Sequence, residues 1–97
     1  MKAFYSEYVR HCMRFYARHP YPKFRTDIDK QNWYACENAL KAFNDIEREL
    51  LITIYRPCDT IPDNVYHMSV ERKISQDAIW KLISELEHKI AKKRNLI

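Results

Sequence analysis

Residues 74–95 read ISQDAIWKLISELEHKIAKKRN, and this stretch decides the kind of fold that the chain can adopt. Ser75 is a good helix N-cap residue, and Asp77 places an acid in the first turn, where it interacts favourably with the helix dipole. The apolar residues that follow recur every three or four positions, which puts them on one helix face. These residues are Ile79, Leu82, Ile83, Leu86 and Ile90. The stretch therefore predicts a long amphipathic helix with one buried stripe.

The composition favours helices throughout. The chain has 97 residues, which is enough for one domain with a single modest core, and 46% of them are hydrophobic. Glycine is absent, although tight hairpin turns and phosphate-cradling loops depend on it. A sheet protein and a nucleotide-binding P-loop are therefore disfavoured. The fold class that we expect is all-α, a small bundle of about five helices.

The first two helices are predicted before Asn44. Residues 2–18 show helical spacing of an apolar and aromatic band, and Pro20 and Pro22 end that helix because proline cannot continue it. The members of the band are Phe4, Tyr5, Tyr8, Val9, Cys12, Phe15 and Tyr16. After a loop, a second helix is expected to start with Asp27 or Asp29 as its N-cap and to carry apolar residues as far as Phe43.

Two more helices are predicted from capping signals. Asn44 and Glu47 have the spacing of a capping box, so a third helix should span 45–56. Its expected apolar face consists of Ile46, Leu50, Leu51, Ile54 and Tyr55. Thr60, with Pro62 in the first turn, should start a fourth helix over 61–72. The residues of that helix expected to face inward are Val65, Met68 and Ser69.

Arginines recur at steps of four along the first predicted helix. Arg10, Arg14 and Arg18 lie in phase with Lys2, so the four cations should share one face. Such a face contacts phosphates or is simply solvated, and we expect the second because charge runs usually form solvated helix faces.

Catalysis is not expected. Cys12, Cys36 and Cys58 are widely spaced and lack the paired pattern of a zinc or redox motif, so we interpret them as reduced structural thiols. The four histidines are scattered, and none has a cysteine or carboxylate at a telling spacing. The sequence predicts neither an enzyme, a metal site nor a cofactor.

Location and partners are suggested by charge. Glu7, Arg10, His11 and Arg14 interrupt any apolar run that a signal peptide would need. No segment approaches the roughly 20 apolar residues of a membrane span. We therefore expect a cytoplasmic protein without membrane contact. A net charge of +4 suits a polyanionic partner.

The second half of the chain resembles a known family. The segment Ile46-Glu47-Arg48-Glu49-Leu50-Leu51, followed by Met68-Ser69, Ile74-Ser75 and Ile79 with Leu82, is similar to the fourth conserved region of sigma-70 type initiation factors. It resembles in particular the small sigma-region-4-like regulators of phages and conjugative elements of Gram-positive bacteria. Their chains often end in a basic tail, here residues 91–96. The resemblance covers residues 44–96, so we expect 44–97 to form a helix-turn-helix and 1–43 to pack on the same core.

The resemblance implies a sequence-specific DNA-binding transcriptional regulator. In that family the fourth helix lies across double-stranded DNA and the start of the fifth enters the major groove. The implied base contacts are Gln76, Asp77 and Lys81. The implied contacts to the DNA backbone are Ser75, Lys73, Ser84, Lys92, Lys93 and Arg94. RNA polymerase is a further partner that the resemblance suggests.

The chain departs from the family in several positions. Lys73 stands where a glycine is usual and Arg72 where a leucine is usual, so the turn must be built differently or Arg72 must lay its stem over the core. Trp80 replaces an arginine and is expected to pack against the third helix. Glu85 and Glu87 would repel phosphates if they faced the duplex, which confines the expected contacts to the first two helical turns.

The alternative function is a helical protein-interaction or dimerisation module that does not bind DNA. Salt dependence separates the two, because binding to phosphates weakens steeply as salt rises whereas an apolar interface hardly changes. The target sequence, the direction of regulation and the oligomeric state, including a homodimer, stay open.

Overall fold

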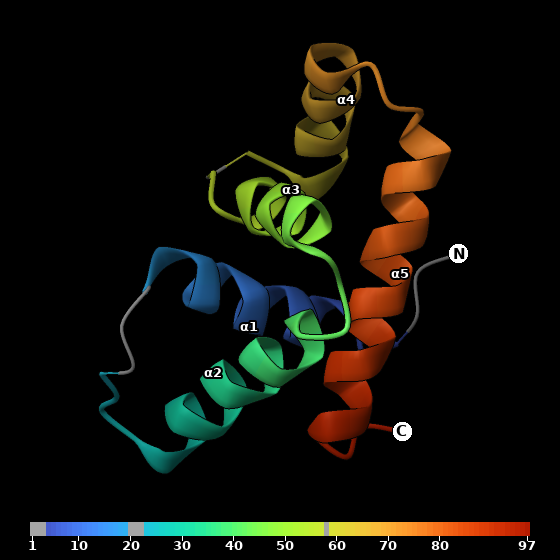
Figure 1. The fold of residues 1–97 in the computed structure, drawn as a ribbon. Helices are drawn as coiled ribbons and strands as arrows, with labels where there is room; N and C mark the ends of the chain where they lie inside the picture. Colours follow the sequence, from blue (N-terminus) through green and yellow to red (C-terminus); the bar gives the residue numbers. More distant parts are fainter. Residues whose placement is uncertain (1–3, 20–22, 58) are drawn as a thin grey trace.

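The computed structural model describes residues 4–19, 23–57 and 59–97, and within them it contains five helices and no strand. The helices are α1 (Ser6–Arg18), α2 (Asp27–Leu40), α3 (Asp45–Tyr55), α4 (Ile61–Arg72) and α5 (Gln76–Lys93). The expected all-α fold is thus confirmed. Figure 1 shows that α5 spans the molecule, with its first turns near α4 and its last turns near α2.

Four of the helices begin with a side-chain cap. Thr26, Asn44, Thr60 and Ser75 each accept a hydrogen bond from the backbone amide three residues further on. The predicted capping box of Asn44 and Glu47 is complete, with both reciprocal bonds formed. The predicted cap of α2 was wrong, because the cap is Thr26, one residue before Asp27 and three before Asp29, and both aspartates lie inside the first turn, where they favour the dipole instead.

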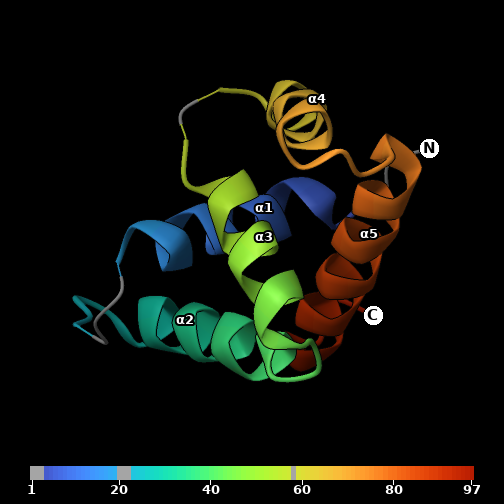
Figure 2. The same cartoon turned by 45° about the horizontal axis from the view of Figure 1, so that its top comes forward.

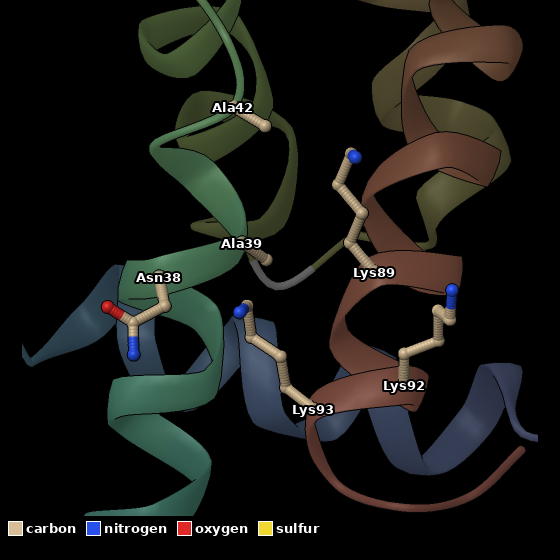
Figure 3. A pocket seen from close by; sticks show the side chains of 6 residues that line it. All are labelled: Asn38, Ala39, Ala42, Lys89, Lys92 and Lys93. Atoms are coloured by element: carbon tan, nitrogen blue, oxygen red, sulfur yellow. The ribbon is translucent and has the colours of Figure 1, made fainter.

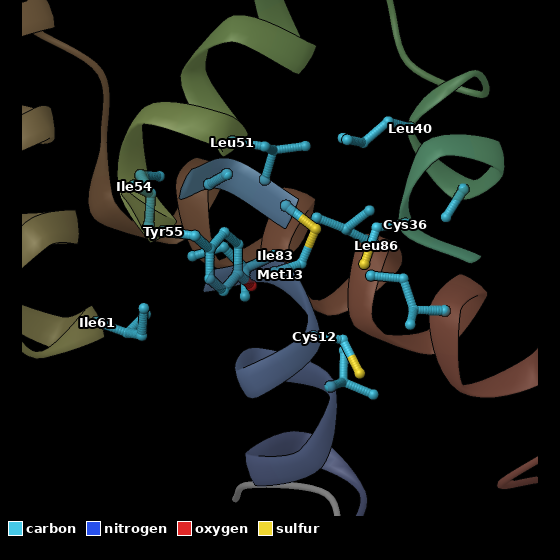
Figure 4. Packing of buried hydrophobic residues seen from close by; sticks show 14 of the residues in the cluster. Cys12, Met13, Cys36, Leu40, Leu51, Ile54, Tyr55, Ile61, Ile83 and Leu86 are labelled. Atoms are coloured by element: carbon cyan, nitrogen blue, oxygen red, sulfur yellow. The ribbon is translucent and has the colours of Figure 1, made fainter. Parts of the chain in front are cut away.

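A single hydrophobic core draws on all five helices. Fully buried side chains include Val9 of α1, Cys36 of α2, Leu51 of α3, Val65 of α4 and Leu86 of α5. Figure 4 shows side chains from α1, α2, α3 and α5 converging on one volume. Helices α1 and α2 therefore share one core with α3, α4 and α5.

Some residues of the predicted apolar faces lie outside this core. Phe4 is 82% exposed and Ile46 is 73% exposed, while Tyr8 is also exposed. In α1 the buried face is shifted toward Met13 and Ala17, because α2, α3 and α5 all pack on that side. Ile46 lies in the first turn of α3, at its edge. Apolar spacing predicted the helices correctly but assigned these three side chains to the wrong environment.

Two helices end in a left-handed residue that is not glycine. Lys73 after α4 has φ 56° and Asn95 after α5 has φ 58°. After α5, the amide of Leu96 donates to Ala91 O at 2.8 Å and that of Asn95 to Lys92 O at 3.1 Å, which is the Schellman pattern of a helix end. Since the sequence has no glycine, a lysine and an asparagine take the conformation that glycine adopts at least cost.

None of the helices in the described ranges has the length and apolar character that crossing a membrane requires.

Candidate nucleic-acid interface

Helices α4 and α5 are joined by a tight turn. Lys73 adopts φ 56° and ψ 42°, and the amide of Ile74 donates to Ser69 O at 3.2 Å. Ser75 then caps α5 by accepting from the amide of Ala78. In Figure 2, α4 is seen more nearly end-on while α5 runs across the view, so the two helices are not parallel. The turn is thus closed by Lys73 in the left-handed conformation, which costs a non-glycine residue about 1–2 kcal/mol.

Helix α3 fixes α4 from one side. Arg72 donates to both carboxylate oxygens of Glu49, at 2.7 and 2.6 Å, and these bonds hold the pKa of Glu49 below its usual range. Asn64 is buried and donates to Ile54 O at 2.8 Å and to Asp59 O at 3.3 Å. Two arrangements were expected, a turn built differently or an Arg72 stem lying over the core. Neither describes Arg72 fully, because this arginine forms an ion pair with Glu49 across the α3–α4 interface.

The arginines of α1 fix the α3–α4 connection from the other side. Arg14 donates to Pro57 O and to Asp59 O, both at 2.6 Å. Arg18 donates to Arg56 O at 3.2 Å. Arg14 and Arg18 therefore contact the α3–α4 connection, so the arginine face is more than a solvated one, although Arg18 stays exposed. Lys2 lies outside the described residues.

The remaining arginine of that series meets a buried acid. Arg10 Nε donates to Glu87 Oε2 at 2.8 Å, and Tyr55 Oη donates to the same oxygen at 2.9 Å. Burial and the negative charge of Glu87 raise the pKa of Tyr55 well above its usual value. Glu87 is thus buried and faces no duplex, whereas Glu85 is exposed. Trp80 is half-buried against the core, with the Arg10 guanidinium 5.9 Å from its ring centroid, which is a cation–π contact.

Sequence reasoning missed the roles of Arg14, Asn64 and Glu87, which together position α4 and α5. The four-residue spacing of the arginines was visible, but the carbonyls and the carboxylate that they contact lie 38 to 77 positions away.

The residues implied to read bases lie on the exposed start of α5. Gln76, Asp77 and Lys81 are all exposed, and no side-chain hydrogen bond occupies them within the described residues. Ser84 is exposed as well, and steps of four and three place Asp77, Lys81 and Ser84 on one face. The structure therefore brings these residues together, with the exposed Lys73 just before them in the turn.

The charges of this surface are nearly balanced. Lys73 and Lys81 contribute two exposed cations, while Glu71 and Asp77 contribute two exposed acids. Contacts here would depend on hydrogen bonds to base edges more than on attraction to phosphates.

The basic tail lies at the opposite end of α5. Lys92 follows Gln76 by sixteen residues, which places it about 24 Å along the helix axis, whereas the major groove is only about 8.5 Å deep. Arg94 Nε donates to Asn32 Oδ1 at 2.6 Å and its Nη1 to Gln31 Oε1 at 2.8 Å. Arg94 is therefore held by α2, which argues against its implied contact with a DNA backbone. Lys92 and Lys93 are exposed beside α2.

The described residues carry no metal-binding cluster of histidine, cysteine or acidic side chains. Cys12 and Cys36 are free and buried, as expected of structural thiols, whereas Cys58 lies outside the described residues. Burial raises the pKa of Cys12 to about 11 and raises that of Cys36 as well. Thiols of this kind are poor nucleophiles near neutral pH.

Comparison of the whole chain with family models, curated proteins and solved structures finds no significant match.

Proposed function

We propose that the chain is a sequence-specific DNA-binding regulator of transcription in which α4 and α5 act as a helix-turn-helix. The observation that carries this proposal is the exposed start of α5, a capped helix end whose polar side chains are unoccupied and directly follow a tight turn. The sigma-region-4 resemblance of residues 44–96 adds a reason to favour DNA over other ligands. A regulator of this kind, carried by a phage or mobile element, would act in the cytoplasm.

The side chains at this end suit base edges. Glutamine can bond the amino group and ring nitrogen of adenine, a carboxylate accepts from the amino group of cytosine, and lysine suits guanine or phosphate. Gln76, Asp77 and Lys81 supply these groups in the first two turns. Lys73 and Ser84 would then contact the backbone, and Ser75 keeps its hydroxyl proton for a phosphate because its oxygen already accepts the cap bond.

The rest of the molecule supports this role by holding α4 in place. Arg14 binds the connection before α4, and Arg72 ties the end of α4 to Glu49 on α3. A reading helix must be held in one orientation to discriminate bases. The N-terminal helices would then serve as a brace, and contact with RNA polymerase belongs to the same proposal.

Selection from a random duplex library tests the proposal, since it measures binding and delivers the site together. Gln76→Ala and Asp77→Ala should each cost about 1–3 kcal/mol of discrimination at one base pair while leaving thermal unfolding unchanged. His88→Ala, an exposed change further along α5, is the matched control and should alter nothing. If no duplex is enriched by the wild-type chain, the proposal fails.

A protein-interaction role without DNA binding is the second candidate, and one observation favours it. Tyr66 and Val70 are 54% and 61% exposed and lie four residues apart, so they form an apolar pair on the outer face of α4. Paired with the same face of a second copy, they would bury that surface in a homodimer. Light scattering at increasing salt separates the candidates, because such a dimer persists in salt whereas complexes with DNA weaken.

A further inference from the structure

A groove runs between α2 and α5, at the end of α5 far from Gln76. Two hollows of about 390 and 420 Å³ form it, and they adjoin, since both are lined by Asn38 and Lys93. Residues of α5 and its C-terminal end supply one wall, namely Lys89, Lys92, Lys93, Arg94 and Asn95. Residues of α2 and the turn after it supply the other, namely Gln31, Tyr34, Ala35, Asn38, Ala39 and Ala42.

The groove is strongly basic. Its lining includes four cations and no acid. Lys89, Lys92 and Lys93 form no ion pair with any described residue, and in Figure 3 the side chains of Lys89 and Lys93 extend from α5 toward α2. Arg94 is fixed in the wall by its bonds to Gln31 and Asn32. Like charges held this close repel one another, and an anionic partner would relieve that repulsion.

The shape of the groove favours a single peptide chain. Ala35 and Ala39 are buried at its base, and the exposed Ala42, in the turn after α2, has a short side chain that leaves room for a peptide backbone. Asn38 offers an amide to peptide groups, and Tyr34, 41% exposed, offers an aromatic surface at one end. The axes of packed helices lie about 8–10 Å apart. A recess between two such helices is too narrow to admit a DNA duplex, whose major groove alone is about 12 Å wide.

We propose that this groove binds an acidic peptide segment of a partner protein. The carboxylates of the peptide pair with Lys89, Lys92 and Lys93, while its backbone lies over the exposed Asn38 and Ala42 on the opposite wall. This inference goes beyond the proposed function, because half of the groove belongs to α2, outside the segment that resembles a DNA-binding region. It also gives the basic tail a role other than contact with DNA.

The test uses the full chain and a fluorescent peptide of alternating glutamate and alanine, with binding followed by anisotropy. The wild type should bind the peptide, and the affinity should fall as salt rises. Lys92→Gln combined with Lys93→Gln should weaken peptide binding by about tenfold. This is the effect of losing two charge contacts whose interaction free energies are near the upper end of the range for exposed ion pairs. Lys73→Gln combined with Lys81→Gln removes the same charge at the other end of α5 and should leave peptide affinity unchanged.

A second variant tests the groove from its opposite wall. Asn38→Glu places an acid among the lysines from an exposed position of α2, and it should weaken peptide binding by about tenfold. Asn38→Gln keeps the amide and should bind as the wild type does. Circular dichroism on each variant checks that the helices are retained.

The outcomes separate this inference from the proposed function. If the wild type does not bind the peptide, or if the Lys92/Lys93 and Asn38→Glu variants bind it as well as the wild type, the inference is wrong. If the Lys92/Lys93 variant loses affinity for the selected duplex and the peptide is not bound, those lysines serve DNA, and only the inference is overturned. Peptide binding by a wild type that binds no duplex supports the inference and overturns only the proposed function.

Discussion

Glu87→Gln is the change that best tests how the bundle is held together. The carboxylate of Glu87 accepts from Arg10 of α1 and from Tyr55 of α3, so one side chain of α5 joins three helices. Glutamine has nearly the same shape but no charge. Both donors bond the same oxygen, Oε2, so the amide oxygen of glutamine can accept from both, but the Arg10 guanidinium loses the negative charge that balances it.

The magnitude follows from the burial of the pair. The side chains of Arg10 and Glu87 are 19% and 5% exposed, so the acid is desolvated and the arginine keeps some contact with water. Removing one partner of a buried ion pair costs about 3–5 kcal/mol, and the partial exposure of Arg10 places this case near the lower end. We expect a loss of about 3 kcal/mol in the free energy of unfolding. For a domain of this size each kcal/mol lowers Tm by roughly 4–8 °C, so Tm should fall by more than about 10 °C.

Urea denaturation and thermal melting measure both quantities. Glu85→Gln removes the same charge two residues earlier on the exposed side of α5, and it should change stability by less than about 0.5 kcal/mol. Tyr55→Phe should cost about 1.5 kcal/mol, the value of a hydrogen bond to a charged group. In the double variant with Glu87→Gln the two losses should fail to add. If Glu87→Gln and Glu85→Gln destabilise the protein equally, the buried network is not what joins the helices.

Three further changes test other contacts. Arg14→Gln removes two hydrogen bonds to the α3–α4 connection and should lower stability by about 1 kcal/mol, with faster amide exchange in α4 than in α2; uniform exchange across both helices would contradict a local brace. Lys73→Gly should raise the free energy of unfolding by about 0.5–1 kcal/mol, because relief of left-handed strain exceeds the entropy cost of glycine; a loss of stability in urea would show that the turn is unstrained. Burial raises the pKa of Cys12 to about 11 and also raises that of Cys36, so both thiols stay protonated in the folded state where the unfolded chain ionises them. The contribution of these thiols to the free energy of unfolding is complete below the ordinary thiol pKa of about 8.5. It should be lost at higher pH by up to about 1.4 kcal/mol per pH unit for each thiol. A free energy of unfolding in urea that does not change between neutral and strongly alkaline pH would refute this.

The candidate site was predictable only in part. The exposed start of α5 follows from Ser75, from the polar residues after it and from the apolar stripe, all within a few turns of one helix. The roles of the residues in the basic tail were harder to predict, because Lys92, Lys93 and Arg94 look equivalent in sequence. Only the packing of α2 against α5 shows that Arg94 is bonded to Asn32, 62 positions away, while its neighbours remain exposed.

The sequence by itself determined the helices. The starts of α3, α4 and α5 depend on the predicted caps Asn44, Thr60 and Ser75, and a cap is a contact between residues three positions apart, so local reasoning suffices there. Glu85 and Glu87 show what it could not determine. Both are acids in the middle of α5, but one is exposed and the other is buried, because Arg10, 77 positions away, and Tyr55, 32 positions away, come to it only when α1 and α3 pack against α5. Tertiary structure alone decided which charges are joined inside the bundle and which are left for a partner, since burying a charge is tolerated only where packing supplies its counterpart.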